Sequence, residues 1–92
     1  RIYYHYGLDI GGAEGLAEVV AATDGIVVSS GKELLKGHED TPAKPRYDVV
    51  YILDGRGWYY RYSHLHTIAK AIKPGAKVKM GQLVGILGME GG

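Results

Sequence analysis

The sequence predicts an all-β domain, built as a sandwich or barrel of short antiparallel strands. Short apolar runs recur along the 92 residues and are separated by turn signals, which is the pattern typical of such folds. Fifteen glycines and eight tyrosines, with no phenylalanine, indicate a turn-rich β protein. A chain of this length is near the lower limit at which one core supports itself without staples. We therefore expect a single domain over residues 1–92.

The turn signals divide the chain into six expected strands. Thr23-Asp24-Gly25 predicts a tight turn between the second and third strands, and residues 54–57 (Asp-Gly-Arg-Gly) predict a hairpin between the fourth and fifth. A short extended piece is expected around Val78, between two glycine-containing turns. Residues 67–72 could hold a single helical turn, and no longer helix is expected. The strands are expected over residues 2–6, 18–22, 25–30, 47–53, 58–65 and 83–87.

Residues 31–46 are expected to form a long polar loop, because they combine two prolines with mixed charges. Loops of that length inside a compact domain are usually functional or mobile, so this loop is the expected contributor to substrate specificity. It contains His38-Glu39-Asp40, which could be interpreted as a metal cluster. Consecutive side chains point in different directions, however, and we interpret these three as residues of a solvated loop.

Composition excludes several classes of protein. The chain has no cysteine, so neither a disulfide scaffold nor a thiolate zinc site is available. The net charge is +1 with bases scattered among acids, and no basic stripe suggests nucleic acid. No apolar run is long enough to span a bilayer. The chain begins at Arg1 in what reads as mid-strand, so we expect a piece of a longer polypeptide, from which export cannot be inferred.

The most informative stretch is His5-Tyr6-Gly7-Leu8-Asp9. Neutral imidazole and carboxylate are ligands that zinc takes in catalytic sites. In a regular strand His5 and Asp9 would lie about 13 Å apart, too far to share one ion. Gly7 can relax the strand into a bulge or turn that brings both side chains to one point. The alternative is a surface strand end with two unrelated polar residues.

A second group of candidates follows in residues 58–66, which have strong strand propensity from their aromatic side chains. Alternation places Trp58, Tyr60, Tyr62, His64 and His66 on one face, with the two histidines roughly 7 Å apart. Such a pair suits a cleft floor better than a packed core. If zinc binds His5 and Asp9, a nearby imidazole can take a proton from a bound water or donate to an oxyanion.

The order of these motifs resembles the lysostaphin/LytM-type zinc endopeptidases over essentially the whole chain. His-x-Gly-x-Asp comes first, then residues 21–27 (Ala-Ala-Thr-Asp-Gly-Ile-Val), which fit the early hairpin of that family. Tyr62-Ser63-His64-Leu65 and the turn-and-strand signature at residues 72–85 complete the match. The resemblance implies a small antiparallel sheet or β-sandwich of the barrel-sandwich (duplicated hybrid) type.

The resemblance also implies roles. His5 and Asp9 would be zinc ligands, and His64 would be the catalytic histidine beside the metal. The enzyme would hydrolyse peptide cross-links or stem peptides of bacterial cell-wall peptidoglycan through a zinc-activated water. That substrate implies an extracytoplasmic location, whether periplasmic, in the cell wall or secreted.

The resemblance leaves one ligand missing. The family carries a later His-x-His motif whose second histidine is the third zinc ligand, and this chain stops inside the preceding glycine-rich loop, at Gly92. We expect the third ligand beyond Gly92, from a companion segment of the same precursor that packs beside residues 58–66. His66 belongs to a similar His-x-His pattern, but its position aligns it with the earlier strand, so it is only a substitute candidate.

Three other interpretations were weighed. A non-catalytic member of the same fold would bind wall peptides or activate an amidase, but such members usually lose the ligands that are present here. A biotinyl or lipoyl carrier would share the pattern around residues 74–82, but it needs an exposed lysine beside methionine at a hairpin, and neither Met80 nor Met89 is followed by lysine. Residues 11–15 are rich in glycine but lack the lysine and helix of a phosphate loop.

Overall fold

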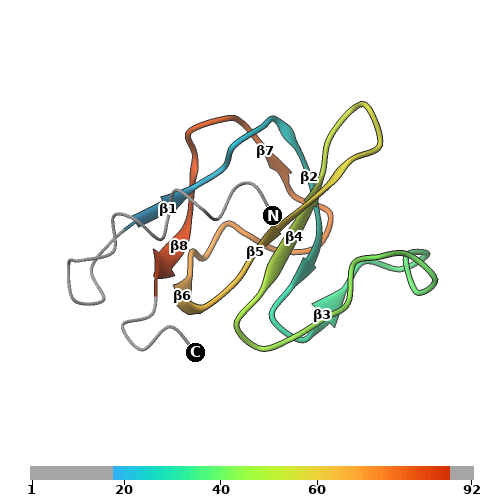
Figure 1. The fold of residues 1–92 in the computed structure, drawn as a ribbon, viewed down its shortest axis with the longest axis horizontal. Helices are drawn as coiled ribbons and strands as arrows, with labels where there is room; N and C mark the ends of the chain where they lie inside the picture. The colour runs from blue at the N-terminus through green and yellow to red at the C-terminus, as the bar shows by residue number, and fades with distance from the viewer. Residues whose placement is uncertain (1–17, 88–92) are drawn as a thin grey trace.

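The computed structural model describes residues 18–87, which form eight β-strands in two antiparallel sheets (Figure 1). The first sheet has the strand order β1-β8-β6. The second has the order β3-β2-β4-β5, and its fifth strand, β7, pairs with β2. No helix occurs among these residues, so the predicted all-β class is confirmed. The strands are β1 (Glu18–Val20), β2 (Gly25–Ser30), β3 (Glu33–Leu34), β4 (Val50–Leu53), β5 (Tyr59–Tyr62), β6 (Leu65–Ile68), β7 (Lys77–Val78) and β8 (Leu83–Leu87).

Several predicted elements are confirmed. Strands β2 and β8 have the predicted bounds, and β7 is the short extended piece expected around Val78. Residues 54–57 form the predicted hairpin, since Leu53 lies opposite Tyr59 and the N–H of Asp54 donates to the carbonyl of Trp58 at 3.0 Å. The turn is closed by Gly57, whose φ of 92° lies in the region that favours glycine. The strand expected over residues 2–6 lies outside the described residues.

The single strand predicted over residues 58–65 is wrong. The chain leaves the second sheet after Tyr62 and joins the first sheet at Leu65, so two strands, β5 and β6, replace one. Tyr62 is the last residue of β5 to pair with β4, opposite Val50, whereas Leu65 pairs with Leu87 of β8. The residues on both sides of this break have similar strand propensity, so the sequence does not reveal it. The break depends on which sheet each segment pairs with, and the tertiary structure sets that pairing.

Other boundaries also differ from prediction. Residues 21–27 do not form an early hairpin, because β1 pairs with β8 and β2 pairs with β4, and the turn at 23–25 carries the chain between sheets. Thr67 and Ile68 continue β6, and the helical turn expected over 67–72 is a single reverse turn with a 3.0 Å bond from the Ile72 N–H to the Ala69 carbonyl. The 31–46 loop contains the short strand β3, and β4 begins only at Val50.

The core lies between the two sheets and takes side chains from both. Val27, Val50 and Ile52 come from the second sheet and Val84 comes from the first, and all four are fully buried. Alternation along β4 sends Val50 and Ile52 inward, which is the expected pattern for a strand with one buried face. The packed core thus fixes how the two sheets face each other and how the chain crosses between them.

Candidate functional site

His64 lies at the point where the chain crosses from the second sheet to the first, between β5 and β6 (Figure 1). Its φ is 61°, and it is the only non-glycine with positive φ among residues 18–87. For an L-residue this left-handed conformation costs roughly 1–2 kcal/mol. The imidazole is half-buried, and its Nδ1 atom is buried without a hydrogen-bond partner in the described part of the chain. Backbone strain and an unpaired buried nitrogen in one residue are features that cluster at functional sites.

His66 occupies a different environment. The register of β6 against β8 shifts between Leu65 and Thr67, so His66 is the extra residue of a β-bulge, and its side chain is exposed. The alternation that placed His64 and His66 on one face therefore fails twice, first at the strand break and then at the bulge.

The predicted placement of the aromatic residues on one face is also wrong. Tyr62 is 3% exposed and belongs to the core, whereas Trp58 is 63% exposed at the hairpin. Tyr60 packs against the core, and its hydroxyl donates to Asp54 at 3.2 Å. Of the five residues assigned to one face, only His64 combines partial burial with an unpaired buried polar atom.

Asp48 lies beside the His64 crossing, and sequence analysis missed it. The carbonyl oxygen of Asp48 accepts a 3.1 Å hydrogen bond from the N–H of Leu65, the residue after His64. The Asp48 carboxylate is buried and forms a 2.9 Å ion pair with Nε of Arg46. The antiparallel register of β4 against β5 is the signal that could have identified Asp48. Val50 lies opposite Tyr62, so continuing the register by two residues brings Asp48 opposite His64.

The described residues contain no complete metal centre. No three His, Cys, Asp or Glu side chains between residues 18 and 87 gather closely enough to hold an ion. His38-Glu39-Asp40 lie in the polar loop, where the His38 carbonyl accepts a 2.8 Å hydrogen bond from the Thr41 hydroxyl. His5 and Asp9, the predicted zinc ligands, lie outside the described residues.

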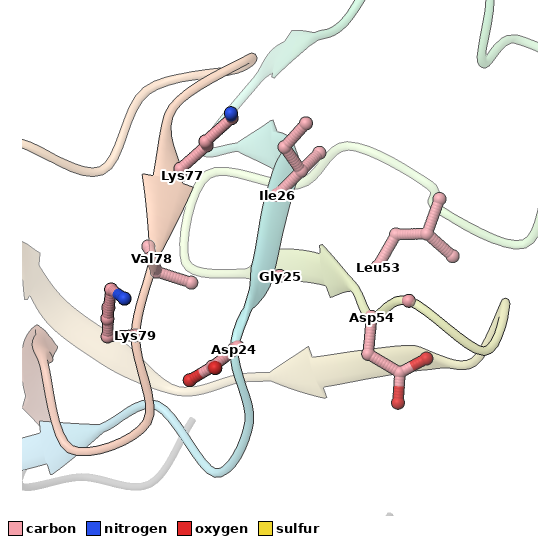
Figure 2. Close-up of a pocket in the computed structure, with 9 residues that line it drawn as sticks. Asp24, Gly25, Ile26, Leu53, Asp54, Lys77, Val78 and Lys79 are labelled. Carbon is pink, nitrogen blue, oxygen red and sulfur yellow. The ribbon is translucent and has the colours of Figure 1, made fainter.

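A hollow of about 490 Å³ lies at the opposite end of β4 from Asp48. Figure 2 shows the residues that line it, with Gly25 of β2 between Val78 of β7 and Leu53 of β4. The residues that line the hollow come from β2, the end of β4 and β7, and they include neither His64 nor Asp48. The hollow is therefore distinct from the residues at the His64 crossing.

Asp54 organises the hairpin beside this hollow. Burial acts to raise the pKa of its carboxyl, but the N–H groups of Trp58 and Arg56 both donate to Oδ1 at 2.9 Å and act in the opposite direction. The Arg56 guanidinium and the Tyr60 hydroxyl bind Oδ2, and together these donors lower the pKa of Asp54 from 3.8 to about 2. Both carboxylate oxygens of Asp54 accept hydrogen bonds from residues of its own hairpin. We therefore interpret Asp54 as a structural residue.

The fold and the crossing define a class: a small two-sheet antiparallel β domain with a strained, half-buried histidine at the strand crossing. The family model described as peptidase family M23 matches residues 3–92, and the chain belongs to that family of peptidases. No curated protein and no solved structure matches the chain. A search of the described residues for a helix long and apolar enough to cross a membrane found none.

Proposed function

We propose that this chain is part of a lysostaphin/LytM-type zinc endopeptidase that hydrolyses peptide cross-links or stem peptides of bacterial peptidoglycan. The observation that carries the proposal is the state of His64 in a chain of peptidase family M23. Its imidazole is half-buried, held in a strained backbone conformation, and has a buried nitrogen without a partner among residues 18–87. His38 Nδ1 is also buried without a partner, so the combination with the strained backbone is what distinguishes His64.

His5 and Asp9 are the proposed protein ligands of the metal. The donor set fits zinc, since imidazole nitrogen and carboxylate oxygen are both ligands of catalytic zinc sites. A third ligand is proposed from a His-x-His segment that follows Gly92. Zinc held there would supply Lewis-acid activation of water and of the scissile carbonyl.

The proposed work of His64 is proton transfer at its imidazole. An imidazole can accept a proton from the attacking water and return it to the leaving amine. Alternatively, as a donor it can stabilise the developing oxyanion. Partial burial of the ring limits competing contact with bulk water, which strengthens either interaction. Since the substrate is a wall polymer, the proposed location is extracytoplasmic.

The test uses the full-length polypeptide that contains this chain. We expect near-stoichiometric zinc, which His5→Ala and Asp9→Ala abolish and His38→Ala, the matched control in the polar loop, leaves unchanged. His64→Ala is expected to retain zinc but to lose hydrolysis of cross-linked peptidoglycan. Hydrolysis is measured by the appearance of new amino termini.

The second candidate function is a non-catalytic wall-peptide binder or amidase activator of the same fold. Binding of peptidoglycan fragments without zinc and without new amino termini would favour this candidate and refute the endopeptidase. Retention of hydrolysis in His64→Ala would refute the role given to that residue.

A further inference from the structure

We propose that Asp48, fixed by Arg46, is a positioning residue that holds His64 in its left-handed conformation. The inference rests on the proposed catalytic role of His64 and adds a residue to it. It starts from the fact that a φ of 61° costs a histidine roughly 1–2 kcal/mol and persists only if the surrounding structure imposes it. The residues on either side of His64 show what imposes it.

The backbone on both sides of His64 is anchored to one short segment, residues 48–50. On the N-terminal side, Tyr62 pairs with Val50 at the end of β5. On the C-terminal side, the N–H of Leu65 donates to the carbonyl of Asp48 at 3.1 Å, and Leu65 itself is buried in the core. Tyr62 and Leu65 are thus held by Val50 and Asp48, which lie only two residues apart on the facing segment. Ser63 and His64 must connect these two positions, and the left-handed conformation of His64 allows them to do so.

The Asp48 carbonyl can serve as an anchor only if its own segment is rigid. The N–H of Val49 donates to the Arg46 carbonyl at 3.0 Å, which closes a turn over residues 46–49. Two further bonds tie this turn to Gly31 after β2: the Gly31 N–H donates to the Val49 carbonyl at 2.9 Å, and the Arg46 N–H donates to the Gly31 carbonyl at 3.0 Å. The turn therefore belongs to the base of the 31–46 loop.

The side chain of Asp48 completes the clamp. Its carboxylate is 6% exposed, and a buried charge is costly unless it is paired. Arg46 Nε supplies the opposite charge 2.9 Å from Oδ1, although the contact lacks hydrogen-bond geometry and the Arg46 side chain remains 52% exposed. The ion pair spans the turn that presents the Asp48 carbonyl to Leu65, so loss of either charge loosens the anchor without touching His64 directly.

The consequence concerns geometry at the reacting atoms. Catalytic side chains must be held within about 0.5 Å of their productive position, and a misplacement of about 1 Å can reduce the rate on the order of a hundredfold. Residues that act in this way change kcat far more than KM, because the substrate contacts are unaffected.

The test compares Asp48→Asn and Arg46→Gln in the full-length polypeptide, with Asp40→Asn as the matched control in the exposed part of the same loop. Asn keeps the shape of Asp48 but loses its charge, and Arg46 is exposed enough that Arg46→Gln should fold even if Asp48→Asn does not. We expect kcat for peptidoglycan hydrolysis to fall by about tenfold in both, with KM changed less than about twofold. Arg46→Lys, which keeps the charge, should recover part of the loss.

A second readout does not depend on activity. Hydrogen exchange of the Leu65 amide should accelerate, and the ring resonances of His64 should shift, in both variants but not in Asp40→Asn. If Arg46→Gln leaves the Leu65 amide and the His64 ring unchanged, the positioning role is refuted. If both respond but hydrolysis is the same in every variant, the clamp stands and the catalytic role proposed for His64 is the part that fails.

Discussion

The hydroxyl of Tyr62 accepts a 3.0 Å hydrogen bond from the backbone N–H of Ala22, 40 residues earlier in the chain. Tyr62 ends β5 in the second sheet, and Ala22 follows β1 of the first sheet, where the chain turns toward β2. The bond therefore joins the two sheets at one of the points where the chain crosses between them. The same tyrosine is buried in the core and lies two residues before His64 in the chain.

Tyr62→Phe is expected to destabilise the domain by about 1–2 kcal/mol, because the N–H of Ala22 loses its acceptor in a partly buried position. Urea unfolding measures the difference. Tyr47→Phe is the matched control, since Tyr47 is 66% exposed, and we expect its effect to stay within about 0.5 kcal/mol. Equal stability of the two variants would contradict the role of the Tyr62 hydroxyl.

Gly25→Ala and Gly85→Ala should each destabilise the domain by about 1–3 kcal/mol through overpacking. A Cβ at Gly25 would collide with the carbonyl oxygen of Leu53, and one at Gly85 would collide with the carbonyl oxygen of Thr67. Both obstacles are backbone atoms of a neighbouring strand, which cannot rotate away. Gly55→Ala serves as the control, because nothing lies within 4 Å of its Cβ position. Thermal denaturation of the three variants should separate the first two from the third.

The left-handed conformation of His64 predicts that glycine is more stable than alanine at this position, the reverse of the order expected within a regular strand. His64→Gly should be more stable than His64→Ala by about 1 kcal/mol, since glycine accepts positive φ without a steric penalty. At Arg61, within strand β5, the order should be reversed, because glycine weakens a regular strand. Chemical denaturation of the four variants makes the comparison. An alanine advantage at both positions would show that His64 is not held in the left-handed region.

Asp54 is expected to make the free energy of unfolding depend on pH in the acid range. Its pKa is about 2 in the folded protein against an ordinary value of 3.8, so its favourable contribution is fully present above pH 5. The contribution is lost as the pH falls from about 5 through 2, because the unfolded chain binds the proton first. Asp54→Asn should flatten the fall in unfolding free energy across this range, whereas Gly55→Ala in the same hairpin should leave the slope unchanged. Parallel slopes for Asp54→Asn and the parent protein would refute the assignment.

Local signals in the sequence were sufficient for much of the fold. Short apolar runs bounded by turn signals predicted the correct bounds of β2 and β8, and the Asp-Gly-Arg-Gly sequence predicted the β4–β5 hairpin. These features depend on neighbours within a few residues, which is the range over which propensity and turn chemistry act. The order of short motifs likewise made the coarser family accessible, and the M23 match confirms it at the level of that peptidase family.

The site was only partly accessible. His64 was identified as a candidate, but the strand that was expected to carry it is two strands in different sheets. His66 was placed on the same face by alternation, which a bulge cancels, and Trp58 and Tyr62 were placed on one face although Trp58 is exposed and Tyr62 lies in the core. Each error comes from extending a period of two through a point where pairing with another strand changes the backbone.

The sequence by itself determined the all-β class, most of the strands and the membership of His64 in a recognisable motif, because these depend on local chemistry and residue order. Only the tertiary structure decided that His64 has a left-handed backbone conformation where the chain crosses between the sheets, and that His66 is exposed on a bulge. It also decided that Asp48, paired with Arg46, hydrogen-bonds to the residue after His64. Those facts arise from hydrogen bonds such as that between Asp48 and Leu65, whose partners are brought together only when two sheets pack around one core.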